Sequence, residues 1–346
     1  MRAIVNDLAL SPTSPRHHLV HGCPGSGKTF LLNAAVEALG AGRRPPLVLQ
    51  PFGLGVSSDG DLLVEALRGH VDISGNRVAN NDSSARLRLE QVVVDTAAGR
   101  PILLVLDDID VLFARLPRGD QLHLRMWTRE AHVRVLASAQ SLTPPLVRAP
   151  WPWRDAFDWT HLDMLTPDQA VEFVRNEARR SDRPDIANWA GSTTGLSELA
   201  EAYTRLGGTP RVWALVAHQL ATATSVDSAI SRVIDALAPY LLARLKSLPP
   251  GPARLILALA RAQAPISVSD LAREVGIPVR QVATTLGRLK AAGWVSVTTP
   301  AESAADRRRS FYTITDPALR ECIRTFLGHP HSAGISPEPG TPECSA

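Results

Sequence analysis

The sequence predicts a three-layer αβα core with a parallel sheet, followed by a helical part and a small C-terminal module of helices and strands. Three observations carry this prediction. A glycine-rich turn separates a short apolar stretch from an amphipathic helix, short apolar stretches then alternate with helical patterns, and two short helical patterns precede an alternating stretch near the C-terminus. With 346 residues, 45% of them hydrophobic, the chain can bury one large core or two to three smaller ones.

The glycine-rich turn has the spacing G-x-x-x-x-G-K-[ST] of a phosphate-binding loop. Glycines let successive backbone N–H groups converge at a helix N-terminus, where the helix dipole favours an anion. We therefore predict that the turn binds ATP, with Lys28 at the β and γ phosphates as a catalytic residue and Thr29 as a ligand of Mg²⁺. The predicted nucleotide-binding residues of this segment are Gly22, Cys23, Pro24, Gly25, Ser26, Gly27, Lys28, Thr29 and Phe30.

The surroundings of the loop fit this interpretation. Leu19 to His21 form a short apolar strand before it, and an apolar helix face follows it. A second strand is predicted at Leu47 to Gln50, with helical segments near residues 60 to 69 and 83 to 98. Alternating strands and helices predict a parallel sheet with helices on both faces. The apolar helix face comprises Leu31, Leu32, Ala35, Val36 and Leu39.

A continuous apolar run from Ile102 to Leu106 predicts a strand that is buried on both faces. Asp107 and Asp108 follow it, at the sheet edge where open α/β sheets bind ligands. We interpret this pair as a Walker B motif, with Asp107 as the Mg²⁺ ligand and Asp108 as the catalytic residue that polarises the attacking water. The alternative is that both acids are ordinary turn and cap residues.

Two further strands complete the predicted core. The strand Val133 to Ala139 ends at Gln140, whose amide can bond to phosphate or to the lytic water, so it is a candidate catalytic residue; a surface amide is the alternative. Phe157 to Leu162 form the last strand. Thr166 then caps a new helix, with Pro167 at its first position.

These motifs, together with the segments from His161 to Asp168 and from Gly207 to Arg211, resemble the AAA+/STAND group of P-loop ATPases. The similarity covers most of residues 17 to 325 and is greatest to archaeal-type ATPases and origin-recognition ATPases. It implies that Arg211 is a sensor of the nucleotide in a helical lid, although a glycine-capped turn between helices would also explain that segment. Asp108 stands where this group usually has Glu, which favours slow hydrolysis and a switch over a motor.

The predicted domains are a P-loop NTPase core over residues 1–165, a helical lid over 166–235, a winged-helix domain over 236–328 and a disordered tail over 329–346. The winged helix is predicted from a capped helix from Ser267 to Gly276, a second helix from Pro278 to about Ala292, and two strands near Val295 and Phe311. The tail is rich in Pro, Gly and Ser without periodicity.

Basic residues concentrate in the winged-helix region. Residues 236 to 330 contain 13 Lys and Arg against 6 Asp and Glu, whereas residues 1 to 235 contain 24 against 26. Such a bias is typical of a surface that binds nucleic acid. The second helix keeps Val282, Leu286 and Leu289 on its buried stripe. The candidate DNA-contacting residues are Arg280, Gln281, Thr284 and Arg288 on that helix and Arg307, Arg308 and Arg309 between the strands.

Two functions stay open from the sequence. The preferred one is an ATP-dependent switch, regulatory or initiator-like, that binds duplex DNA through the winged helix. The other is a STAND-type signalling or defence NTPase whose winged helix packs against protein and mediates autoinhibition, with nucleotide-dependent homo-oligomers. No apolar run of 18 residues and no signal peptide are found, so we expect a cytoplasmic protein without a membrane partner. The three cysteines form neither a metal pattern nor a disulfide framework.

Overall fold

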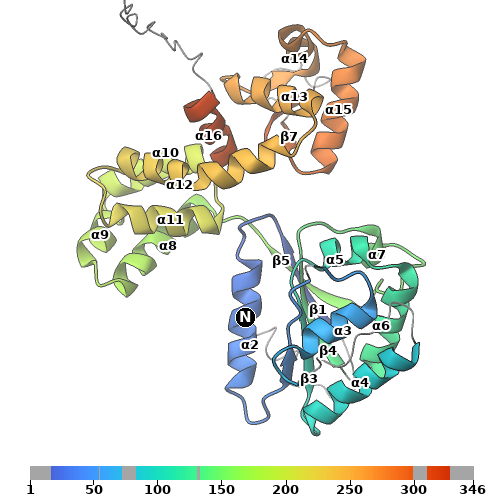
Figure 1. The fold of residues 1–346 in the computed structure, drawn as a ribbon. Coiled ribbons are helices and arrows are strands. Elements are labelled where there is room, and N and C mark those ends of the chain that lie inside the picture. The colour runs from blue at the N-terminus through green and yellow to red at the C-terminus, as the bar shows by residue number, and fades with distance from the viewer. Residues whose placement is uncertain (1–16, 54, 72–82, 131–132, 299–309, 328–346) are drawn as a thin grey trace, which may run out of the picture. The chain divides into compact units, whose positions relative to one another are not determined.

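The computed structural model describes residues 17–53, 55–71, 83–130, 133–298 and 310–327. The chain divides into two compact units, one ending at Met164 and the other beginning at Leu165 (Figure 1). The first unit holds the predicted phosphate loop and both acids, and the second holds the predicted lid and winged helix.

Within its described residues, the first unit contains a parallel five-stranded sheet with the strand order β2-β3-β4-β1-β5. Its strands are β1 (His17–Gly22), β2 (Leu47–Leu49), β3 (Ile102–Leu106), β4 (Val133–Ala139) and β5 (Phe157–Leu162). Its helices are α2 (Lys28–Gly40), α3 (Asp59–Leu67), α4 (Ser83–Ala97), α5 (Ile109–Arg115), α6 (Arg118–Glu130) and α7 (Pro144–Val147). The parallel α/β fold is confirmed, while α5, α6 and α7 were not predicted.

Helices cover both faces of this sheet (Figure 1). On one face, Leu32 and Ala35 of α2 pack with Val20, Val105 and Leu136 of the strands. On the other face, apolar side chains of α3, α4, α5 and α6 form a larger cluster with alternate strand residues. Since every strand residue of β3 is buried, the two clusters enclose its sides completely, as its unbroken apolar run predicts.

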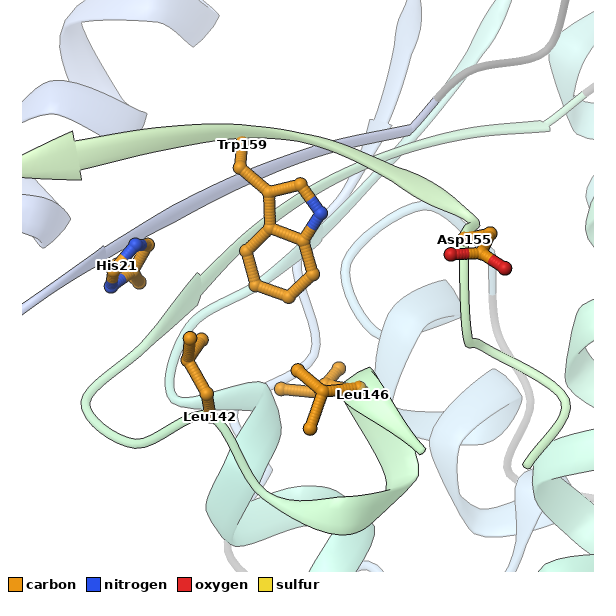
Figure 2. Close-up of a pocket in the computed structure, with 6 residues that line it drawn as sticks. His21, Leu142, Leu146, Asp155 and Trp159 are labelled. Atoms are coloured by element: carbon orange, nitrogen blue, oxygen red, sulfur yellow. The ribbon is translucent and has the colours of Figure 1, made fainter. Parts of the chain in front are cut away.

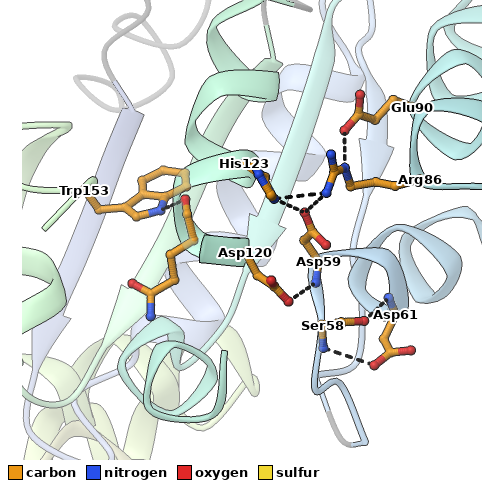
Figure 3. Close-up of polar contacts among 9 residues, drawn as sticks. Ser58, Asp59, Asp61, Arg86, Glu90, Asp120, His123 and Trp153 are labelled. Carbon is orange, nitrogen blue, oxygen red and sulfur yellow. Dashed lines mark hydrogen bonds and ion pairs between the residues drawn. The ribbon is translucent and has the colours of Figure 1, made fainter. Parts of the chain in front are cut away.

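Polar contacts connect three helices on the face of the sheet that the larger hydrophobic cluster covers (Figure 3). The Asp59 carboxylate on α3 lies 3.7 Å from Arg86 of α4 and 3.7 Å from His123 of α6. The Asp59 N–H donates to Asp120 of α6 at 3.2 Å. Burial and the neighbouring Asp120 raise the pKa of the Asp59 carboxyl. These contacts hold α3, α4 and α6 in register beside the strands.

The second unit is mostly helical. Its helices are α8 (Pro167–Arg180), α9 (Pro184–Trp189), α10 (Thr193–Leu206), α11 (Pro210–Leu220), α12 (Val226–Lys246), α13 (Pro250–Arg261), α14 (Val268–Val275), α15 (Val279–Ala291) and α16 (Pro317–Leu327). The Thr166 side chain caps α8 and Pro167 is its first residue, as predicted. One hydrophobic cluster runs from Ala170 to Ile323, so the lid and the winged helix share a core.

The winged helix has the predicted two helices and strand pair. Ser267 caps α14, and Gly276 ends it in the left-handed conformation that favours glycine. The strands β7 (Val295–Thr298) and β8 (Phe311–Ile314) pair antiparallel, and β6 (Ile266–Ser267) pairs with β8. Neither β6 nor α16 was predicted.

The predicted boundary between lid and winged helix, at residues 235 and 236, falls inside the continuous helix α12. The domain boundaries given above stay predictions. Among the described residues, no helix combines the length and the apolar character that crossing a membrane requires.

Candidate functional site

The phosphate loop lies between β1 and α2, where the sequence places it. Gly25 and Gly27 have φ angles of 81° and 94°, a region that side chains with a Cβ rarely adopt. A Cβ on Gly22 would lie 2.7 Å from the Leu162 carbonyl oxygen of β5. Gly22 is therefore required because β1 and β5 approach closely, and the two later glycines are required by the turn itself.

Lys28 is buried, and its ammonium group lies back over the loop. Its Nζ donates to the carbonyl oxygens of Gly22 at 2.9 Å and Cys23 at 3.0 Å. The buried Ser26 hydroxyl has no hydrogen-bond partner among the described residues. A buried hydroxyl without a partner is unfavourable, and a phosphate oxygen would supply the missing acceptor. The loop residues thus fit a bound phosphate chain.

A hydrogen bond joins the loop to the first acid. Thr29 Oγ1 donates to Asp107 Oδ2 at 2.7 Å, so the two predicted Mg²⁺ ligands lie side by side. Asp107 Oδ1 accepts a second hydrogen bond, from Ser138 Oγ of β4. Hydroxyl and carboxylate oxygens are the ligands that Mg²⁺ prefers, so this donor set fits that ion.

The second acid, Asp108, lies beside Gln140. Gln140 Nε2 donates to Asp108 Oδ1 at 3.2 Å, which brings together the two candidate catalytic side chains that the sequence places 32 positions apart. Asp108 has a left-handed backbone, with φ at 51°, and it is the N-cap residue of α5. The third acid of the run, Asp110, accepts from the Ser141 N–H at 2.9 Å and has a structural role at the end of β4.

Ser138 is a site residue that the sequence reasoning missed. It lies in β4 two positions before Gln140, and its side chain is completely buried. A polar residue within the apolar stretch from Val135 to Ala139 was the available signal.

A histidine pair next to the loop was also missed. His21 of β1 and His161 of β5 are register partners, and their Nδ1 atoms are 3.1 Å apart. His161 Nε2 lies 3.1 Å from Asp163 Oδ1. Burial, followed by the nearby His161, lowers the pKa of His21, and Lys28 adds to this effect. His21 therefore favours its neutral form beside the start of the phosphate loop.

A pocket of about 350 Å³ opens next to this histidine pair (Figure 2). Figure 2 shows the Trp159 ring extending from β5 toward Leu142 and Leu146, with His21 and Asp155 at the sides. None of the predicted site residues lines this pocket.

The predicted sensor, Arg211, belongs to the second unit, at the start of α11. Its guanidinium lies over the Tyr240 ring, 5.1 Å from the ring centroid. Gly208 before it is needed for packing, because a Cβ at this position would lie 2.1 Å from the Leu165 carbonyl oxygen. The Leu165 N–H donates to the Gly208 carbonyl oxygen at 2.8 Å, and the Tyr203 hydroxyl donates to the Leu165 carbonyl oxygen at 2.6 Å. The sensor role of Arg211 stays a prediction.

The candidate DNA-contacting residues of α15 lie on its exposed side. Val282, Leu286 and Leu289 are buried, as predicted for the inner stripe of this helix. The four exposed candidates are Arg280, Gln281, Thr284 and Arg288. The Thr284 hydroxyl donates to the Arg280 carbonyl oxygen at 3.0 Å, so a DNA contact would have to share it with the helix.

The remaining candidates, Arg307, Arg308 and Arg309, lie outside the described residues. Their contribution to a DNA-binding surface stays a prediction.

Comparison with known proteins identifies the fold. The Walker-type ATPase PABY2304 of Pyrococcus abyssi is similar over 93% of this chain and 95% of its own, with a TM-score of 0.64 and 14% identity. The ORC2 protein of Aeropyrum pernix, solved as ADPNP–ADP complexes, is similar over 94% of this chain and 91% of its own, with a TM-score of 0.62 and 14% identity.

A family model described as the MarR family matches residues 246–309, which contain α13, α14, α15 and β7. No curated protein matches the sequence. This chain therefore has the AAA+ fold of the archaeal Walker-type and origin-recognition ATPases, and it carries a MarR-type winged helix in its C-terminal part.

Proposed function

We propose that this chain binds ATP with Mg²⁺, hydrolyses it slowly, and acts as a nucleotide-dependent switch that binds duplex DNA through its winged helix. The observation that carries the nucleotide part is the hydrogen bond from Thr29 to Asp107. It joins the phosphate loop to the Walker B acid, and both side chains belong to the ligand set that P-loop ATPases present to Mg²⁺.

Each residue of the site then has a defined task. Loop N–H groups and Lys28 bind the phosphates, and Thr29 with Asp107 hold the cation, which supplies positive charge against the phosphate oxygens when bound. Asp108 accepts a proton from the attacking water, and the Gln140 amide orients the Asp108 carboxylate. Asp108 is one methylene shorter than the usual Glu, which supports slow turnover.

Two observations support the proposed DNA binding: the exposed arginines of α15 and the excess of basic residues in the C-terminal part. Arg280 and Arg288 project from a helix whose other side is buried in the winged-helix core, so they are available to a ligand. Arginine suits this role because its guanidinium bonds both to phosphate oxygens and to guanine edges. The excess of basic residues between positions 236 and 330 supports the same interpretation.

Fluorescence anisotropy with a duplex oligonucleotide tests this proposal, in samples without nucleotide, with ADP and with a non-hydrolysable ATP analogue. We expect affinity that differs between these states and that falls by about 0.9 log units per log unit of salt for each phosphate contacted. The double variant Arg280→Glu/Arg288→Glu should lose most of the affinity. Arg180→Glu is the matched control, because Arg180 is an exposed arginine of the same unit on α8.

One observation favours a second candidate function. The lid and the winged helix share a core, and Arg205 of α10 bonds to Glu321 of α16 through Nε at 2.9 Å and Nη2 at 2.7 Å. Such internal packing is what a signalling NTPase would use for autoinhibition through its winged helix. Light scattering separates the two: oligomers that form with the ATP analogue in a protein without DNA affinity would favour the signalling function and overturn the DNA-binding proposal.

A further inference from the structure

Ser138 occupies a position where an apolar side chain would be expected. It lies in β4 two residues after Leu136, so both side chains are on the same face of the sheet, and its register partner is Val20 of β1. Leu136 and Val20 belong to the apolar cluster that packs against α2. The Ser138 side chain is 0% exposed. Burying a hydroxyl in such surroundings costs free energy unless the hydroxyl is hydrogen-bonded. Its partners therefore indicate what the hydroxyl does.

Both partners belong to the Walker B acids. Ser138 Oγ donates to Asp107 Oδ1, and it accepts from the Asp108 N–H at 2.9 Å. One hydroxyl thus uses its donor on the side chain of the first acid and an acceptor site on the backbone of the second.

The contact to Asp107 sets the direction of its carboxylate. Thr29 holds Oδ2 and Ser138 holds Oδ1, so the carboxylate plane is defined at both oxygens. Each carboxylate oxygen can accept more than one hydrogen bond or ligand, so acceptor capacity remains for a cation. Hydrogen-bonded partners of this kind orient metal ligands and tune their affinity.

The contact to Asp108 sets its backbone. Asp108 adopts φ 51° and ψ 49°, a left-handed conformation that is unfavourable for most residues and persists where neighbours support it. The bond from its N–H to Ser138 is such a support. This conformation places the Asp108 carboxylate within reach of Gln140, the residue that directly follows β4.

We infer that Ser138 is the positioning residue for both acids of the nucleotide site: it directs Asp107 toward Mg²⁺ and holds the turn that presents Asp108 to the attacking water. This inference rests on the proposed ATPase function and extends it to a buried strand residue whose hydroxyl bonds to both acids.

The test compares Ser138→Ala with the wild-type protein in a Mg²⁺ titration of fluorescent ATP-analogue binding. The Mg²⁺ concentration at half-saturation should rise about tenfold in Ser138→Ala. Affinity for the nucleotide without Mg²⁺ should be unchanged, because the phosphate loop is intact. The turnover number should fall with little change in the KM for Mg²⁺–ATP at saturating Mg²⁺. Ser138→Thr, which keeps the hydroxyl, should restore the wild-type midpoint.

Thr128→Ala is the control for a general loss of stability. Thr128 is also 0% exposed in the first unit, and its hydroxyl donates to the Arg125 carbonyl oxygen at 2.9 Å, away from both acids. It should lower the melting temperature and leave the Mg²⁺ midpoint unchanged. A shift of the midpoint in Thr128→Ala equal to that in Ser138→Ala would assign the effect to stability and overturn the inference.

Amide hydrogen exchange of the nucleotide-free protein tests the hydrogen bond from the Asp108 N–H to Ser138. In Ser138→Ala the N–H of residue 108 should exchange faster, while the amides of α2 keep their protection. Suppose that the wild-type protein binds nucleotide, and that Ser138→Ala changes neither the Mg²⁺ midpoint nor the exchange at residue 108. This result would overturn the inference about Ser138 and leave the proposed function intact. A wild-type protein that takes up no nucleotide would overturn the proposed function as well.

Discussion

In the first unit the polar side chains of the proposed nucleotide site bond to one another, whereas in the second unit the candidate DNA-contacting side chains of α15 are exposed. Thr29, Asp107 and Ser138 form a chain of hydrogen bonds, and Asp108 bonds to Gln140. On α15, Arg280 and Arg288 are exposed around a buried apolar stripe.

We therefore expect the two surfaces to tolerate amino-acid substitutions differently. The members of a hydrogen-bonded set that is anchored on the buried Ser138 depend on one another, so one substitution affects binding and stability together. Exposed charges on a helix contribute more independently, and substituting one leaves the fold nearly unchanged. Substitutions in both units and a pH titration can test this contrast.

The largest effect is expected at the phosphate loop. Lys28→Ala removes the ammonium group that bonds to the Gly22 and Cys23 carbonyl oxygens, and with it the charge that the phosphates require. Nucleotide affinity should fall by about 100-fold, since a hydrogen bond to a charged group contributes up to about 3 kcal/mol. Isothermal titration calorimetry measures this change. Equal affinity of the variant and the wild-type protein would mean that the loop is misassigned.

The next effect concerns a close backbone approach in the second unit. Gly208→Ala would place a Cβ 2.1 Å from the Leu165 carbonyl oxygen, so part of the backbone must move. The free energy of unfolding should fall by about 3 kcal/mol. Urea unfolding followed by circular dichroism measures the loss. A stable Gly208→Ala protein with an unchanged midpoint would contradict the packing at Leu165.

A pH effect tests buried polar groups in the first unit. Burial, followed by the charges of Arg125 and Arg134, lowers the pKa of His17 from 6.5 to about 3. The His17 ring binds a proton more readily in the unfolded chain than in the folded protein. The stability that the neutral ring provides is therefore complete above pH 6.5 and is lost as the pH falls toward about 3. The loss should reach about 2 kcal/mol near pH 5.

Amide hydrogen exchange of β1 and β4 as a function of pH measures this loss. In His17→Gln the part of the slope that comes from this side chain should disappear. Identical slopes for the two proteins would show that another group is responsible.

The smallest effect lies on α15. Gly287 is inside this helix, and a Cβ there meets no atom within 4 Å. Gly287→Ala should raise the free energy of unfolding by about 0.5 to 1 kcal/mol, because alanine favours the helix. Thermal unfolding measures the gain. The change in stability should thus have the opposite sign from that of Gly208→Ala, and a destabilised Gly287→Ala protein would mean that other atoms cover this face of α15.

Local patterns predicted the elements that carry the site. The spacing from Gly22 to Thr29 located the phosphate loop, and the apolar run before Asp107 located the Walker B strand, because each signal lies within a few neighbouring residues. The helices α5, α6, α7 and α16 were missed, and so was the third wing strand β6, which is short and is defined by its pairing with β8.

The partners of each side chain depended on topology. Ser138 bonds to both acids because β3 and β4 are neighbours in the sheet, although their sequences are about thirty residues apart. The His21–His161 pair arises in the same way from the pairing of β1 with β5.

Contiguous or periodic residues were enough to predict a phosphate loop, two acids at the end of a buried strand and a helix with an apolar stripe. The oxygens to which Thr29, Ser138 and Gln140 bond, and the core shared by the lid and the winged helix, became known only from the fold. Hydrogen bonds and packing act over a few ångströms, and the residues involved are brought together by the strand order and the helix contacts.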